Sequence, residues 1–122
     1  MAQFDLTANP APKSCRLIDF DKVEVRPGII PETWFLIVSG QKPCTNMEVS
    51  LVPVVYIRCP EYWQIEVVGC LPHGICLDAI GPYTVTIPLA GITGSVGIEV
   101  VGAHKSEKVK VKGGCKSAAP SA

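Results

Sequence analysis

The fold class is decided by the stretch GSVGIEVVGAHKSEKVKVK, residues 94–112. In its second half Val109 and Val111 alternate with lysines, and this period of two is typical of a strand with one face in water. A Gly-Ala-His turn separates this half from a first half rich in valine and isoleucine. The stretch therefore predicts two strands, residues 95–102 and 105–112, joined as a hairpin.

Five further strand-like segments precede this hairpin. They are residues 16–26, with an interruption near 19–21, and then 33–39, 47–57, 62–68 and 83–89. Glycine and proline, eleven of each, separate the segments, and no window has the apolar spacing and end caps of a helix. Because residues 33–39 (TWFLIVS) are apolar on both faces, we expect them to form a central strand. Pro53 marks a bulge or an edge position.

Seven short alternating strands at near-regular spacing predict an all-β fold, an antiparallel β-sandwich of two sheets. In style the sequence is similar to immunoglobulin-like and fibronectin type III modules over residues 15–112. The two mid-strand cysteines that bracket a core tryptophan in antibody domains are absent, and the similarity implies no functional residue. Prolines and small residues predict flexible tails at residues 1–14 and 113–122, on either side of the domain.

Composition and charge limit the classes of partner. The 122 residues fit a single domain, 48% of them are hydrophobic, and the formal net charge is zero. No basic stripe is present, so we expect no nucleic-acid partner. No apolar run is long enough to span a membrane, and no signal peptide is visible. Paired cysteines would favour an extracellular or periplasmic location, and the oligomeric state is left open.

The six cysteines fall at the ends of the predicted strands. If successive strands reverse direction, four cysteines and both histidines gather at one end of the domain. This upper end is expected to hold Cys15, Cys44, Cys70, Cys76, His73 and His104. Cys59 and Cys115 are expected at the lower end. An even number at each end predicts disulfides, although four upper cysteines allow three pairings and the sequence does not choose among them.

A metal site is an alternative use of the same loop. Cys70, His73 and Cys76 have the spacing Cys-x2-His-x2-Cys. Cys44 or Cys15 would supply the fourth ligand of a tetrahedral zinc site. No other cofactor is expected.

A thiol carrier is a second alternative. The run Lys-Val-Lys-Val-Lys-Gly-Gly-Cys ends at Cys115, which follows a predicted strand on a glycine-containing arm. This arm resembles that of sulfur-carrier subunits in thiosulfate-oxidising systems, whose thiol shuttles a covalent adduct between enzymes. The resemblance implies that Cys115 would carry the adduct.

The sequence contains no catalytic motif. It lacks a nucleophile elbow and a phosphate-binding loop, and a cysteine paired with His104 would have only Asp78 to orient it. We therefore predict a binding or assembly module and not an enzyme. Its partner, a protein or a glycan, would contact the loops of the upper end or an outer sheet face. The candidate contact residues are Tyr56, Tyr62, His73 and His104.

Overall fold

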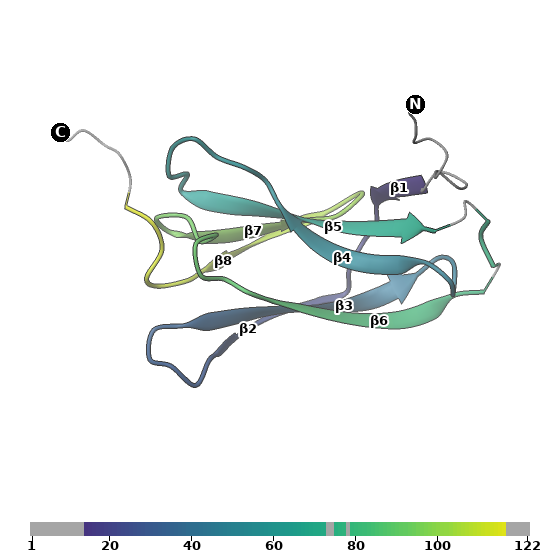
Figure 1. Ribbon diagram of the computed structural model, residues 1–122, viewed down its shortest axis with the longest axis horizontal. Helices are drawn as coiled ribbons and strands as arrows, with labels where there is room; N and C mark the ends of the chain where they lie inside the picture. The colour runs from purple at the N-terminus through teal and green to yellow at the C-terminus, as the bar shows by residue number, and fades with distance from the viewer. Residues whose placement is uncertain (1–13, 73–74, 78, 117–122) are drawn as a thin grey trace, which may run out of the picture.

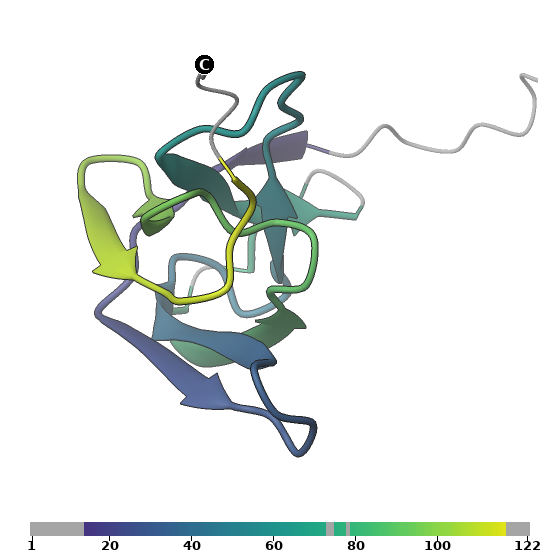
Figure 2. The same cartoon turned by 90° about the vertical axis from the view of Figure 1, so that its left-hand side faces the viewer.

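The computed structural model describes residues 14–72, 75–77 and 79–116, which form eight strands in two sheets packed face to face (Figures 1 and 2). The strands are β1 (Ser14–Leu17), β2 (Lys22–Pro27), β3 (Trp34–Lys42), β4 (Glu48–Pro53), β5 (Tyr62–Leu71), β6 (Gly81–Pro88), β7 (Gly97–Val101) and β8 (Ser106–Lys110). The prediction of an all-β fold in two sheets is confirmed. The predicted first segment is two strands, one in each sheet.

The larger sheet is built around β5, and the smaller one around β3. β4 pairs with one edge of β5, while β7 and β1 share the other edge and β8 pairs with β7. In the smaller sheet β3 lies between β2 and β6, so the apolar segment is a central strand as predicted. β4 ends at Pro53 and is an edge strand, because proline has no N–H for a further partner.

One pair of strands corrects the predicted antiparallel arrangement. β5 and β7 run parallel, with Tyr62 beside Gly97 and Glu66 beside Val101. Because β6 belongs to the other sheet, the chain reverses twice before it returns to β5, and β7 then has the same direction as β5. The larger sheet is therefore mixed.

The core lies between the sheets, where alternate residues of each strand face inward. The inward residues of the three central strands have no solvent exposure: Leu36, Val38, Ile65, Val67, Ile98 and Val100. Trp34 and Trp63 are partly buried and pack against this core from its lower end. The alternation seen in the sequence thus identifies the buried face of each strand.

The chain passes from the larger to the smaller sheet through residues 18–21, which we call the crossing segment. Ile18 and Phe20 point into the core and are 4% and 1% exposed. Asp19, between them, faces the β7–β8 hairpin instead. The alternation of a strand therefore continues through a segment that belongs to neither sheet.

The crossing segment is hydrogen-bonded to both sheets. The N–H of Ile18 donates to the carbonyl of Val67 on β5 at 3.0 Å. The N–H of Asp21 donates to the carbonyl of Ser39 on β3 at 2.8 Å. These bonds satisfy backbone groups that would otherwise lose their water at the junction.

The crossing segment passes close to two glycines, whose lack of a side chain leaves room for its backbone. A Cβ on Gly40 of β3 would lie 3.0 Å from the Cα of Phe20, and one on Gly102 would lie 3.0 Å from the carbonyl oxygen of Ile18. Both contacts are with backbone atoms, which cannot rotate away as a side chain can. A side chain at either position would therefore push the segment away from a sheet.

All six cysteines form disulfides. The pairs are Cys15–Cys70 between β1 and β5, Cys44–Cys76 between the β3–β4 and β5–β6 loops, and Cys59–Cys115 between the β4–β5 loop and the segment after β8. Two pairs lie at the upper end, where β5 ends, and one lies at the lower end, where β5 begins. The upper end is on the right in Figure 1. The predicted division into four upper and two lower cysteines is confirmed, and the structure selects one of the three upper pairings.

Gly40→Ala and Gly102→Ala should each lower the free energy of unfolding by about 1–3 kcal/mol, because the added methyl group crowds the backbone. Gly81→Ala is the matched control, since its Cβ would meet only side-chain atoms at 3.5 Å or more. Urea unfolding of the three disulfide-intact variants measures the effect. Equal stability of all three would show that the crossing segment has room to move.

The double variant Cys59→Ser with Cys115→Ser should lose about 4 kcal/mol of stability. Without the cross-link between residues 56 apart in the chain, the unfolded state gains conformational entropy, and the estimate is the size of that gain. Cys44→Ser with Cys76→Ser opens a loop of only 32 residues and should lose slightly less. Urea midpoints compare the two, and a loss below about 1 kcal/mol for the first pair would contradict the estimate.

Candidate binding site

The three predicted contact residues that the structure describes lie at opposite ends of the molecule. Tyr56 and Tyr62 lie at the lower end, where Tyr56 packs edge-on against Trp63 with ring centroids 5.1 Å apart. Lys108 lies 5.0 Å from the centre of the Tyr62 ring on the outer face of the larger sheet. His104 lies at the upper end, and His73 lies outside the described residues.

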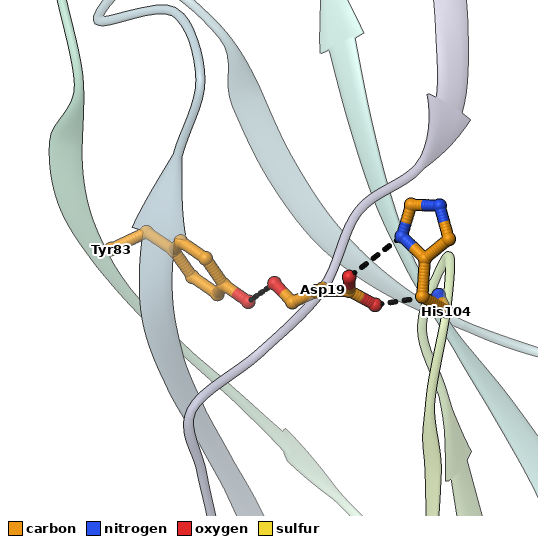
Figure 3. Close-up of polar contacts among 3 residues, drawn as sticks. All are labelled: Asp19, Tyr83 and His104. Atoms are coloured by element: carbon orange, nitrogen blue, oxygen red, sulfur yellow. Dashed lines mark hydrogen bonds and ion pairs between the residues drawn. The ribbon is translucent and has the colours of Figure 1, made fainter.

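At the upper end, His104 is held by Asp19 of the crossing segment (Figure 3). One carboxylate oxygen of Asp19 accepts a hydrogen bond from the backbone N–H of His104 at 2.7 Å. The other carboxylate oxygen lies 2.9 Å from Nδ1 of the His104 ring. The carbonyl oxygen of Asp19 accepts the hydroxyl of Tyr83 at 2.8 Å. Asp19 therefore links the β7–β8 hairpin of one sheet to β6 of the other.

These contacts change the pKa values of two of the groups. The backbone N–H of His104, and then its side chain, stabilise the carboxylate and lower the pKa of Asp19 below its ordinary value of 3.8. Burial raises the pKa of Tyr83 to about 12, and the charges of Asp21 and Asp19 act in the same direction. The crossing segment thus carries an anion at neutral pH, and Tyr83 remains a hydroxyl donor.

A His–Asp pair can orient a general base, because an acceptor on Nδ1 leaves Nε2 free. The pair borders an open cleft of about 370 Å³, which is also lined by Arg16, Gln41 and Pro43. No serine, threonine or cysteine lines this cleft among the residues that the structure describes. The described lining of this cleft therefore combines a His–Asp pair with Arg16 and contains no hydroxyl or thiol side chain.

The disulfides bear directly on the metal and thiol-carrier hypotheses. Cys44, Cys70 and Cys76 are bonded to other cysteines, so in this form they offer no thiolate to a metal. Within the described residues no group of three or more histidine, cysteine or acidic side chains could hold an ion. Cys115 is bonded to Cys59 and has no free thiol to carry an adduct.

The lower end contains a second cleft, of about 280 Å³, beside Trp34. Three segments remote in the sequence line it: residues 32–34 at the start of β3, 89–93 after β6, and 112–115 after β8. Figure 2 looks onto this end and shows the yellow C-terminal segment between the β2–β3 and β4–β5 loops. We call the cleft that these three segments line the Trp34 cleft.

Left-handed backbone conformations converge on the Trp34 cleft. Glu32, Gly91 and Gly113 have φ angles of 65°, 80° and 81°, and each comes from a different one of the three segments. Among the described residues no other has a positive φ. Glu32 is the unusual member, because a non-glycine residue in this region is strained and such strain often occurs at functional sites.

The C-terminal side of the cleft is firmly attached to the body of the molecule. The Cys59–Cys115 disulfide joins it to the β4–β5 loop, and the N–H of Cys115 donates to the carbonyl of Thr93 at 2.9 Å. Gly114 packs so closely on Gly94 that a Cβ would collide with its backbone. Residues 114 and 115 are therefore held against the body of the molecule by these contacts.

An apolar pocket of about 270 Å³ adjoins the Trp34 cleft, with which it shares Thr33, Trp34 and Ala90. It is lined by Ile29, Ile30, Phe35, Pro88 and neighbouring residues. The two isoleucines are at the tip of the β2–β3 loop and are 102% and 67% exposed. Sequence reasoning missed them, although their position after Pro-Gly in a turn was visible and should have indicated apolar residues at a loop tip.

The β2–β3 loop is held in its conformation by backbone bonds. The N–H of Gly28 donates to the carbonyl of Thr33 at 2.8 Å, and the N–H of Thr33 donates to the carbonyl of Ile30 at 3.2 Å. The hydroxyl of Thr33 also donates to Ile30. The loop thus presents its isoleucines to water from a fixed backbone.

Because folding lowers the pKa of Asp19, its contribution to stability is present above pH 3.8 and is lost as the pH falls through the lower folded value. NMR titration of the carboxyl carbon should show the lowered pKa. His104→Ala should raise this pKa only in part, because the backbone N–H remains. An ordinary pKa for Asp19 in the folded protein would contradict the geometry of Figure 3.

Comparison with protein-family models, curated proteins and solved structures found no match to this chain. None of the described residues forms a helix with the length and hydropathy needed to traverse a bilayer.

Proposed function

We propose that this chain is a non-catalytic binding module, cross-linked by its disulfides, that docks a protein partner through its lower end. The observation that carries this proposal is the pair of exposed isoleucines, Ile29 and Ile30, beside an apolar pocket. We also propose that the two sheets are a variant of the immunoglobulin-like arrangement, with a parallel β5–β7 pair.

The apolar exposure of the lower end supports docking. Val55 and Ile57 of the β4–β5 loop are also almost fully exposed, so two loops at this end carry aliphatic side chains in water. Exposed apolar groups on a soluble domain are typical of surfaces that a partner covers. Single exposed aliphatic residues need no such explanation, but adjacent ones at a loop tip beside a pocket do.

The rigidity of the lower end supports the same function. Backbone bonds hold the β2–β3 loop, and the Cys59–Cys115 disulfide holds the β4–β5 loop to the C-terminal segment. A surface that is already ordered loses little conformational entropy when its partner binds. This differs from the sequence-based expectation, which gave the upper-end loops or an outer sheet face as the contact surface.

The double variant Ile29→Ser with Ile30→Ser should weaken binding at least about 100-fold, because burying each isoleucine contributes roughly 1.5–3 kcal/mol. Ile75→Ser with Ile80→Ser is the matched control, since these residues are 66% and 73% exposed at the other end. Quantitative affinity capture from an extract of the source cells should recover the same proteins with wild type and control.

The proposal is supported if the proteins captured by wild type and control are lost only with the Ile29/Ile30 variant. Equal recovery with all three baits would overturn it. Analytical ultracentrifugation of the same proteins tests whether the partner is a second copy of this chain. Thermal unfolding should be the same for variant and control, because none of the four side chains belongs to the core.

A further inference from the structure

The Trp34 cleft is lined by a tryptophan whose hydrogen-bond donor the chain itself leaves unused. The indole N–H of Trp34 is buried and has no partner among the described residues. Gly91 and Gly113, which also line the cleft, are exposed, so water satisfies their backbone N–H groups. Buried polar groups in native proteins are nearly always paired, so the indole N–H indicates an acceptor that comes from outside the chain.

The cleft also carries opposite charges that do not pair with each other. Glu32 and Lys112 both line the cleft, and both also line an adjoining space of about 220 Å³ next to Trp34. Among the described residues the salt bridges are Arg26–Glu24 and His104–Asp19, so neither of the two charges is neutralised in this way. A ligand could therefore place an anion on Lys112 and donor groups on Glu32.

The size of the cleft limits the ligand to about one ring. Its 280 Å³ lies just below the range of roughly 300–1,000 Å³ that is usual for ligand pockets. Trp34 offers an aromatic surface, against which the C–H face of a ring can pack. The backbone around the ligand is fixed by the disulfide and by the left-handed turns, as a specific site requires.

We propose that the Trp34 cleft binds a carboxylated sugar, a uronic acid residue, free or in a glycan. Its carboxylate would meet Lys112 and accept the indole N–H of Trp34, its hydroxyls would donate to Glu32, and its ring would pack on Trp34. A zwitterionic amino acid such as alanine could satisfy the two charges, but it has no ring to pack on Trp34. The proposal goes beyond protein docking, because it concerns a small ligand in the Trp34 cleft, which Ile29 and Ile30 of the docking surface do not line.

Isothermal titration calorimetry of the full, disulfide-intact chain with methyl glucuronide and methyl galacturonide tests the proposal. We expect saturable binding of at least one, with a Kd on the order of 1 mM or below. The methyl ester of the same sugar, methyl glucoside and alanine should each bind at least about tenfold more weakly, because a charged hydrogen bond or the hydroxyls are then missing.

Substitutions of two lining residues test whether the uronide binds in the Trp34 cleft. Lys112→Gln and Glu32→Gln should each weaken uronide binding about tenfold or more, since both change only an exposed charge. Lys108→Gln, on the outer face of the larger sheet, is the matched control and should leave the Kd unchanged. Chemical shift changes on uronide addition should include the Trp34 indole N–H.

The uronide proposal would be overturned by the absence of saturable binding, by equal binding of the neutral sugar, by preference for alanine, or by a Kd insensitive to Lys112→Gln. Its failure is distinct from failure of the docking proposal. Ile29→Ser with Ile30→Ser should leave uronide binding intact, and Lys112→Gln should leave protein capture intact.

Discussion

The fold depends on one constraint: the chain must leave the larger sheet and enter the smaller one within residues 18–21 without opening the core. The constraint is met because Ile18 and Phe20 fill the junction while the backbone bonds to both sheets. It also needs two positions without side chains, Gly40 and Gly102, at the points of closest approach. The crossing segment is therefore a structural element in its own right, although it belongs to no sheet.

Asp19 connects this junction to the rest of the upper end. Its carboxylate holds the β7–β8 hairpin through His104, and its carbonyl holds β6 through Tyr83. Both sheets thus contribute a contact to one residue of the crossing segment. Since His104 is 85 residues away in the chain, the arrangement exists only when both sheets have formed.

The ends of the molecule are stabilised differently from its middle. Sheet hydrogen bonds and the core hold the strands, whereas the loops beyond them are held by turn hydrogen bonds and by disulfides. Two of the three disulfides connect such loops or terminal segments: Cys44–Cys76 at the upper end and Cys59–Cys115 at the lower end. The lower bridge fixes one side of the Trp34 cleft, so the same covalent bond stabilises the fold and shapes the proposed site.

The alternation of apolar residues identified the strands and their buried faces, because the period of two is a local property of extended backbone. Reversal of direction between strands was enough to divide the cysteines between two ends. The sequence did not reveal which upper cysteines pair, that β7 lies parallel to β5, or that Asp19 meets His104. Those features depend on which sheet each strand joins, and that is settled only when distant segments pack together. The Trp34 cleft is the clearest case, because its lining comes from three segments whose left-handed residues carry no common signal in the sequence.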